Sequence, residues 1–203
     1  MTPSHRPRAG SRRWLAASFL VLALGAIGSA RTAAAQEVLD RKSASELLTR
    51  YLADLDTVHV KIVALAEAIP ADKYAWRPTP ETRSVAEALM HVAVEWYFWT
   101  PRSVGGQPPA DFGAPRETIP KLEHTATKAE VLDHLEKSWA HCRAQVAGAD
   151  AGGLTHRMKI FGQDMTLPTA MFIMSGDLHE HLGQLVTYTR SVGEVPPWSK
   201  KAS

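Results

Sequence analysis

The sequence contains a single cysteine, Cys142, so the chain cannot form an internal disulfide. A protein without disulfides depends on its hydrophobic core for stability. The cysteine lies in a stretch with helical periodicity, where a lone cysteine is usually a small core residue rather than a nucleophile. With 203 residues, the chain is long enough for one domain with such a core.

Acidic residues are missing from the first 35 positions, which instead carry five arginines. A run of 17 apolar and small residues (14–30) follows the basic start, and Ala33 and Ala35 then form the small-x-small pattern that signal peptidase accepts. This layout predicts a signal peptide over residues 1–35, cleaved from a mature domain of residues 36–203. A membrane anchor is the alternative, but the run is shorter than the roughly 20 residues that span a bilayer. We therefore expect a bacterial protein exported to the periplasm or the cell exterior, with no stable membrane anchor after cleavage.

The basic segment is compatible with two export routes. Arg12 and Arg13 stand where a twin-arginine signal carries its pair, and an ordinary basic start explains them equally well. The difference matters because the twin-arginine exporter moves folded proteins, so that a metal could be loaded before secretion.

The net charge of the full chain, +2, comes from the predicted signal peptide. Without its five arginines, 18 basic side chains remain against 21 acidic ones, a net charge of −3. A domain of this charge lacks the basic surface that binding to a phosphate backbone requires. We therefore expect a small-molecule substrate and no nucleic acid as partner, and the sequence is compatible with a homodimer.

Strand-like alternation, internal repeats and low-complexity tracts are also absent, which leaves helices as the expected regular structure. Three of the apolar-periodic segments open with a Ser/Thr-x-x-Glu capping box, at Ser43, Ser84 and Thr127. Residues 101–126, with five prolines and three glycines, are expected to form a long loop that serves as a crossover or a site lid. Residues 149–165 are expected to form a second loop, with a short extended piece at its end. The pattern predicts an all-α four-helix bundle with helices at about 45–69, 85–99, 128–146 and 166–192.

The last of these helices contains three side chains that a metal ion accepts, Asp177, His179 and His181. Because an α-helix turns about 100° per residue, Asp177 and His181 share one face, and His179 lies roughly opposite. Gln184 and Tyr188 continue the face of Asp177 and His181, and leucines flank it, so we expect this face to point into the bundle. A carboxylate and an imidazole one turn apart are a common way for a bundle helix to offer two metal ligands.

A third ligand has to come from another helix, and His91 in the apolar stretch ALMHVAVEWYFW is the candidate. Glu95 lies one turn further on the same face, and polar groups in such a run need a partner. Glu95 could replace Asp177 as the carboxylate ligand, because His91 and Glu95 are also four residues apart. Alternatively the site holds no metal, and these polar groups only pair with one another.

These motifs resemble the DinB-like, or YfiT-like, family of four-helix metal-binding proteins. The likeness extends over about residues 43–198, and its carriers are Trp76, Pro78, Ser84, His91, His181, Gly183, Gln184 and the segment 193–197. The resemblance implies a divalent metal held by one histidine of the second helix and a His-x-x-x-His pair of the last helix, at positions 91, 177 and 181. The sequence departs from that pattern at Asp177, where many members have histidine. Thiol-dependent isomerases of the family carry a carboxylate there, so metal binding is still expected.

We therefore predict a metal site of His91, Asp177 and His181 with an open coordination position, which is typical of catalytic sites. Zn²⁺ is the first choice of metal, and Ni²⁺, Mn²⁺ and Fe²⁺ suit the same ligands. Glu95 is assigned as general base or outer partner, and Gln184 as the residue that orients a ligand. The predicted function is a metal-dependent enzyme, a hydrolase or a thiol-dependent transferase or isomerase. A non-catalytic metal-binding protein and a metal-free structural bundle are the alternatives.

Overall fold

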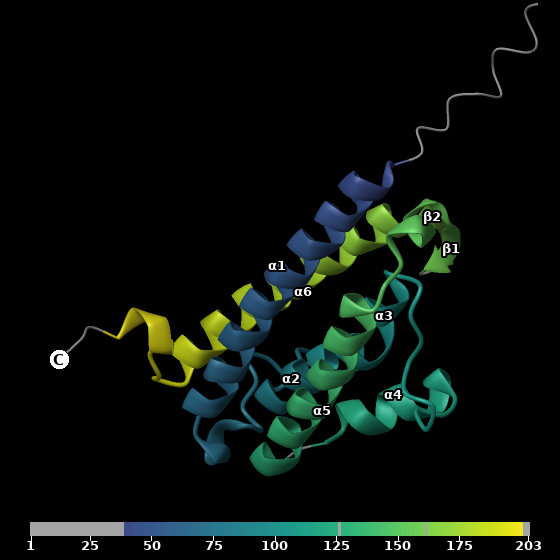
Figure 1. The fold of residues 1–203 in the computed structure, drawn as a ribbon. Coiled ribbons are helices and arrows are strands. Elements are labelled where there is room, and N and C mark those ends of the chain that lie inside the picture. Colours follow the sequence, from purple (N-terminus) through teal and green to yellow (C-terminus); the bar gives the residue numbers. More distant parts are fainter. Residues whose placement is uncertain (1–38, 126, 161, 201–203) are drawn as a thin grey trace, which may run out of the picture. The chain divides into compact units, whose positions relative to one another are not determined.

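The structure, a computed structural model, describes residues 39–125, 127–160 and 162–200 (Figure 1). The predicted signal peptide and its cleavage site lie outside the described residues. Most of the described residues are helical, which confirms the predicted all-α class. Within these residues, no helix combines the length and the apolar character needed to cross a membrane.

Four main helices form the body of the fold: α1 (Arg41–Ala68), α2 (Val85–Val94), α5 (Lys128–Ala147) and α6 (Leu167–Ser191). The connection between α2 and α5 contains two shorter helices, α3 (Thr100–Arg102) and α4 (Pro115–Glu123). A π-helical turn, η2 (Glu95–Trp99), joins α2 to α3, and the 3-10 turns are η1 (Ala71–Lys73), η3 (Ala151–Thr155) and η4 (Pro197–Ser199). The strands are β1 (Arg157–Ile160) and β2 (Gln163–Thr166).

The long helices pack around one hydrophobic core. α1 packs against α5 and α6, and α2 also packs against both. Figure 1 shows α1 and α6 side by side along most of their lengths. Fully buried leucines, isoleucine and cysteine from all four helices fill the space between them: Leu55, Ile62, Leu89, Leu135, Cys142, Leu178 and Leu185. Burial raises the pKa of the Cys142 thiol, in keeping with a core residue rather than a nucleophile.

The three predicted capping boxes have three different outcomes. Ser84 forms the full box with Glu87 at the start of α2, as predicted. Thr127 accepts the Glu130 backbone N–H, but the glutamate carboxylate contacts the threonine hydroxyl instead of the cap backbone. The prediction for Ser43 is wrong, because α1 starts earlier. Asp40 caps the helix by accepting the N–H groups of Lys42 and Ser43, at 2.9 and 3.0 Å.

The prediction of a continuous loop over 101–126 is wrong for its second half, where α4 forms. Pro115 occupies the first turn of α4, where its missing N–H is not needed. Thr118 Oγ1 donates to the Phe112 carbonyl at 2.6 Å and ties the helix to the preceding turn. α4 packs against α2, so this connection covers the helix that carries His91.

The segment before α6 also contains more regular structure than expected. The short extended piece predicted there is an antiparallel two-stranded hairpin, in which Arg157 pairs with Thr166 and Ile160 with Gln163. Gly162 at its turn has a φ of 79°, which favours glycine. The hairpin leads directly into α6, whose second residue is Pro168.

The π-helical turn after α2 begins at Glu95. The Thr100 N–H bonds to the Glu95 carbonyl, five residues back instead of four. Pro101 has no N–H to donate to the carbonyl of Tyr97, four residues back, and α-helical bonding resumes with the Ser103 N–H, which bonds to the Trp99 carbonyl at 3.1 Å. π-helical turns are rare and often occur at functional sites.

Candidate metal centre

Three side chains from two segments of the core converge between α2 and α6: His91, Glu95 and His181. Glu95 Oε1 lies 3.4 Å from His91 Nε2 and 3.1 Å from His181 Nε2. One ligand atom from each residue can be chosen so that all three lie within 4.8 Å of one another. The two imidazole rings stand edge to face, with centroids 4.9 Å apart. This cluster could hold a metal ion, because two imidazole nitrogens and a carboxylate oxygen are common ligands of divalent transition metals.

Two atoms of the cluster are buried without a hydrogen-bond partner among the described residues, namely Glu95 Oε2 and His181 Nε2. His181 Nε2 is at ion-pair distance from Glu95 Oε1, but the contact lacks the alignment of a hydrogen bond. An unpaired buried polar atom costs about 1–3 kcal/mol. A cation at this point would satisfy both atoms, so the residues present fit a divalent metal ion.

Burial governs the protonation of the cluster. Burial raises the pKa of Glu95 to about 7, although the neighbouring His181 opposes the rise. It lowers the pKa of His91, and the contact with Glu123 only partly offsets this effect. For His181, burial also acts to lower the pKa, but the contact with Glu95 and its negative charge outweigh it, so the pKa is raised. The lowered pKa of His91 favours the neutral ring, which keeps an electron pair for a metal. The raised pKa values of Glu95 and His181 mean that a metal has to compete with protons at both groups.

Each histidine also has a contact on its other ring nitrogen. His91 Nδ1 lies 2.5 Å from Glu123 Oε1 on α4. His181 Nδ1 lies 3.4 Å from Gln184 Oε1, one turn further along α6. An acceptor at Nδ1 favours the tautomer that carries its proton there. The Nε2 atoms of both rings, which face Glu95, are then free to act as ligands.

Asp177 lies next to the cluster and on its more open side. Its Oδ1 is 3.8 Å from His181 Nε2, and its side chain is 38% exposed, against 2% for Glu95. Asp177 adds to the burial effect that raises the pKa of Glu95, so the two carboxylates are close neighbours. Of the predicted ligands, the structure therefore brings His91 and His181 together with Glu95, and Asp177 beside them.

His179 lies away from the cluster, as the helical period predicts. Its Nε2 is 2.9 Å from Asp54 Oδ1 on α1, and its side chain is 47% exposed. The second oxygen of Asp54 accepts the Ser175 hydroxyl at 2.7 Å. These contacts tie α6 to α1, and none of them involves His91, Glu95 or His181.

Sequence reasoning missed Glu123. Pro115 followed by Glu117 is a helix-start signal that could have indicated α4. No sequence pattern, however, relates position 123 to position 91. The contact with His91 depends on α4 folding back onto α2.

Comparison with known protein families supports the sequence resemblance. A model of the DinB superfamily matches residues 54–185. The chain belongs to the DinB superfamily. The matched part of this DinB protein contains every residue of the cluster, together with Glu123, Asp177 and Gln184. A comparison with curated proteins found no significant match.

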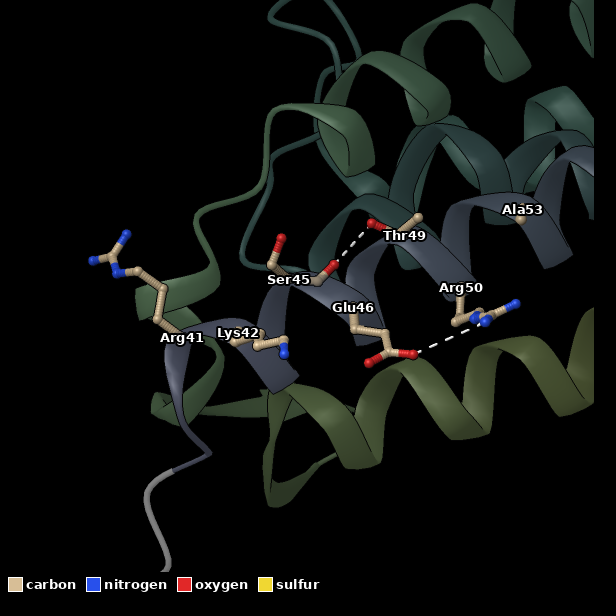
Figure 2. Close-up of a pocket in the computed structure, with 7 residues that line it drawn as sticks. All are labelled: Arg41, Lys42, Ser45, Glu46, Thr49, Arg50 and Ala53. Atoms are coloured by element: carbon tan, nitrogen blue, oxygen red, sulfur yellow. Dashed lines mark hydrogen bonds and ion pairs between the residues drawn. The ribbon is translucent and has the colours of Figure 1, made fainter.

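A surface depression along the start of α1 is a separate feature of the molecule (Figure 2). Its lining side chains all come from α1 and are exposed, and they include an ion pair of Glu46 and Arg50 at 3.9 Å. Thr49 donates to the Ser45 carbonyl within the same helix. The depression shares no residue with the metal cluster, so it forms no part of the candidate site.

Proposed function

We propose that this DinB protein binds a divalent metal ion between α2 and α6 and uses it in catalysis. The observation that carries the proposal is the convergence of two histidine Nε2 atoms on Glu95, with Glu95 Oε2 and His181 Nε2 lacking hydrogen-bond partners in the described part of the chain. His91, Glu95 and His181 are the proposed inner ligands, and Asp177 is the proposed further oxygen donor. Zn²⁺ is the proposed metal, and Ni²⁺, Mn²⁺ and Fe²⁺ suit the same donors.

A metal bound here would supply Lewis-acid chemistry, lowering the pKa of a water or thiol nucleophile. Glu95 directs one carboxylate oxygen at the two histidines, and none of the residues that the structure describes forms a hydrogen bond with the other oxygen. That second oxygen can accept the proton which the nucleophile loses. Gln184, beside His181, is the proposed residue that orients the substrate.

The proposed reaction is attack by water or by a thiol on an electrophilic small molecule, as in a hydrolase or a thiol-dependent transferase or isomerase. The test is a screen of ester, amide and thiol-conjugate substrates, run with and without a chelator. We expect an activity that the chelator removes, that added metal restores and that His181→Ala abolishes. His179→Ala is the matched control and should retain it. An activity that survives both chelation and His181→Ala would contradict the proposal.

One observation favours a second candidate, a metal-free polar network. His91 contacts Glu123 and His181 contacts Glu95, so these polar groups can pair with one another without an ion. In this case the purified protein would contain no bound metal. A protein that binds metal but shows no chelator-sensitive activity would instead be a non-catalytic metal-binding protein.

We also propose that the protein is exported, with residues 1–35 removed as a signal peptide. The basic start, the apolar run and the Ala33-x-Ala35 pattern support this proposal. The mature protein would then act in the periplasm or outside the cell.

A further inference from the structure

We propose that Glu123 positions His91 for metal binding, so that α4 forms part of the metal centre. This inference rests on the proposed function and adds to it a residue from the connection between α2 and α5. Glu123 is the last residue of α4, and its side chain is 24% exposed beside His91 at 22%.

The geometry places Glu123 behind His91 and not among the ligands of the same ion. Glu123 Oε1 approaches Nδ1 of the ring at 2.5 Å, whereas Nε2 faces Glu95 at 3.4 Å. The two nitrogens of one imidazole point in different directions, so they cannot both bind one ion. A carboxylate on Nδ1–H fixes the tautomer and the rotation of the ring and makes Nε2 a stronger ligand.

Glu123 is held in turn by a chain of contacts that also reaches the second histidine. Arg83 Nη2 lies 4.0 Å from Glu123 Oε1. The Arg83 carbonyl accepts the Tyr188 hydroxyl at 3.1 Å, and that hydroxyl accepts the Gln184 amide, also at 3.1 Å. Gln184 Oε1 faces His181 Nδ1. The outer partners of both histidines therefore meet at Arg83, just before the start of α2.

The two histidines differ in the strength of this outer support. The partner of His91 is a carboxylate at 2.5 Å, and the partner of His181 is an amide oxygen at 3.4 Å. A hydrogen bond to a charged acceptor is roughly twice as strong as one between neutral groups. Of the two residues that contact the histidine Nδ1 atoms, Glu123 should therefore contribute more to metal affinity than Gln184.

The test compares three variants of the purified protein by their affinity for Zn²⁺, measured in competition with a chelator. Glu123→Ala removes the acceptor, and Glu123→Gln keeps an acceptor oxygen but loses the charge. Glu117→Gln makes the same chemical change at an exposed position of α4 and serves as the matched control. We expect a loss of about 10- to 100-fold for Glu123→Ala, a smaller loss for Glu123→Gln, and no change for Glu117→Gln.

A second readout separates this inference from the proposed function. Nitrogen NMR of the metal-free protein reports which ring nitrogen of His91 carries the proton. We expect the proton on Nδ1 in the wild type and in Glu123→Gln, and its loss from Nδ1 in Glu123→Ala. If the wild type binds no metal, the proposed function fails, and this spectrum still decides the role of Glu123. A His91 proton on Nε2 in the wild type, or unchanged Zn²⁺ affinity in a folded Glu123→Ala or Glu123→Gln, would overturn the inference.

Discussion

Glu95 Oε1 lies 3.1 Å from His181 Nε2 in the interior between α2 and α6, with the glutamate side chain only 2% exposed. A carboxylate buried to this extent is costly unless it is paired, protonated or bound to a metal. The residues before and after it, Val94 and Trp96, are buried in the core, and its second oxygen has no hydrogen-bond partner among the described residues. A metal ion would supply the missing charge and the missing bonds.

The stability of the metal-free protein should depend on pH because of Glu95. Its pKa in the folded protein is about 7, above the ordinary value of 4.5, so the folded state binds this proton more tightly than the unfolded state. The stabilising contribution is therefore complete below pH 4.5 and is lost as the pH rises through 7. This contribution to the free energy of unfolding is at most on the order of 3 kcal/mol.

Urea unfolding with a chelator present checks this expectation in wild-type protein and Glu95→Gln. The neutral variant should gain stability over the wild type between about pH 5 and pH 8, because it has no carboxyl to ionise and because its His181 no longer has the contact that raises the histidine pKa. A stability difference that does not change with pH would show that Glu95 does not titrate in this window.

Metal binding should release a proton from the cluster. Glu95 has to ionise to become a ligand, and its pKa of about 7 means that it is partly protonated at neutral pH. The apparent metal affinity should fall by about tenfold per pH unit below this pKa. Calorimetric titrations in buffers of different ionisation enthalpy measure the released proton directly. Identical heats in all buffers would rule out this proton release.

Removing two serine hydroxyls should have unequal effects on folding. Ser84→Ala breaks the full capping box of α2, the helix that carries His91, and should destabilise the protein by about 1 kcal/mol. Ser43→Ala should cost much less, because Asp40 caps α1. Thermal or urea unfolding of both variants provides the comparison. A larger loss for Ser43→Ala would mean that α1 starts at Ser43 after all.

If the proposed export is correct, the mature protein should begin at or near Gln36. Mass spectrometry of protein from the native host measures this start, and recovery of a soluble cytoplasmic form that retains residues 1–35 would contradict export. Replacing Arg12 and Arg13 with lysine should block export only if the twin-arginine route is used, and an ordinary signal peptide should tolerate the change.

The long helices and the faces of their polar residues were predictable because both depend on local periodicity. Apolar residues at helical spacing located α1, α2, α5 and α6 to within a few residues. The same helical period placed His179 and His181 on different faces of α6. It also made His91 and Glu95 neighbours on one face, which is how Glu95 entered as an alternative ligand. The meeting of α2 with α6 was expected because a third ligand has to come from another helix and His91 stands in an apolar stretch, and the family resemblance implied the same pairing.

The parts that sequence missed depend on contacts between distant segments. α4 was missed because Pro120 stands inside it and because, in the described chain, none of its side chains is fully buried, so it lacks a strong apolar stripe. Glu123 reaches His91 only because α4 packs on α2. The choice between Asp177 and Glu95 as the nearest carboxylate likewise depends on burial, which spacing alone does not determine.

The metal content of the purified protein and of five single alanine variants tests the central claim most directly. Elemental analysis at fixed pH should find one divalent ion per wild-type chain. We expect its loss in the variants at His91, Glu95 and His181, weakened binding at Asp177, and full retention in His179→Ala. A wild-type protein without metal, or a site lost in His179→Ala and kept in His181→Ala, would contradict the account.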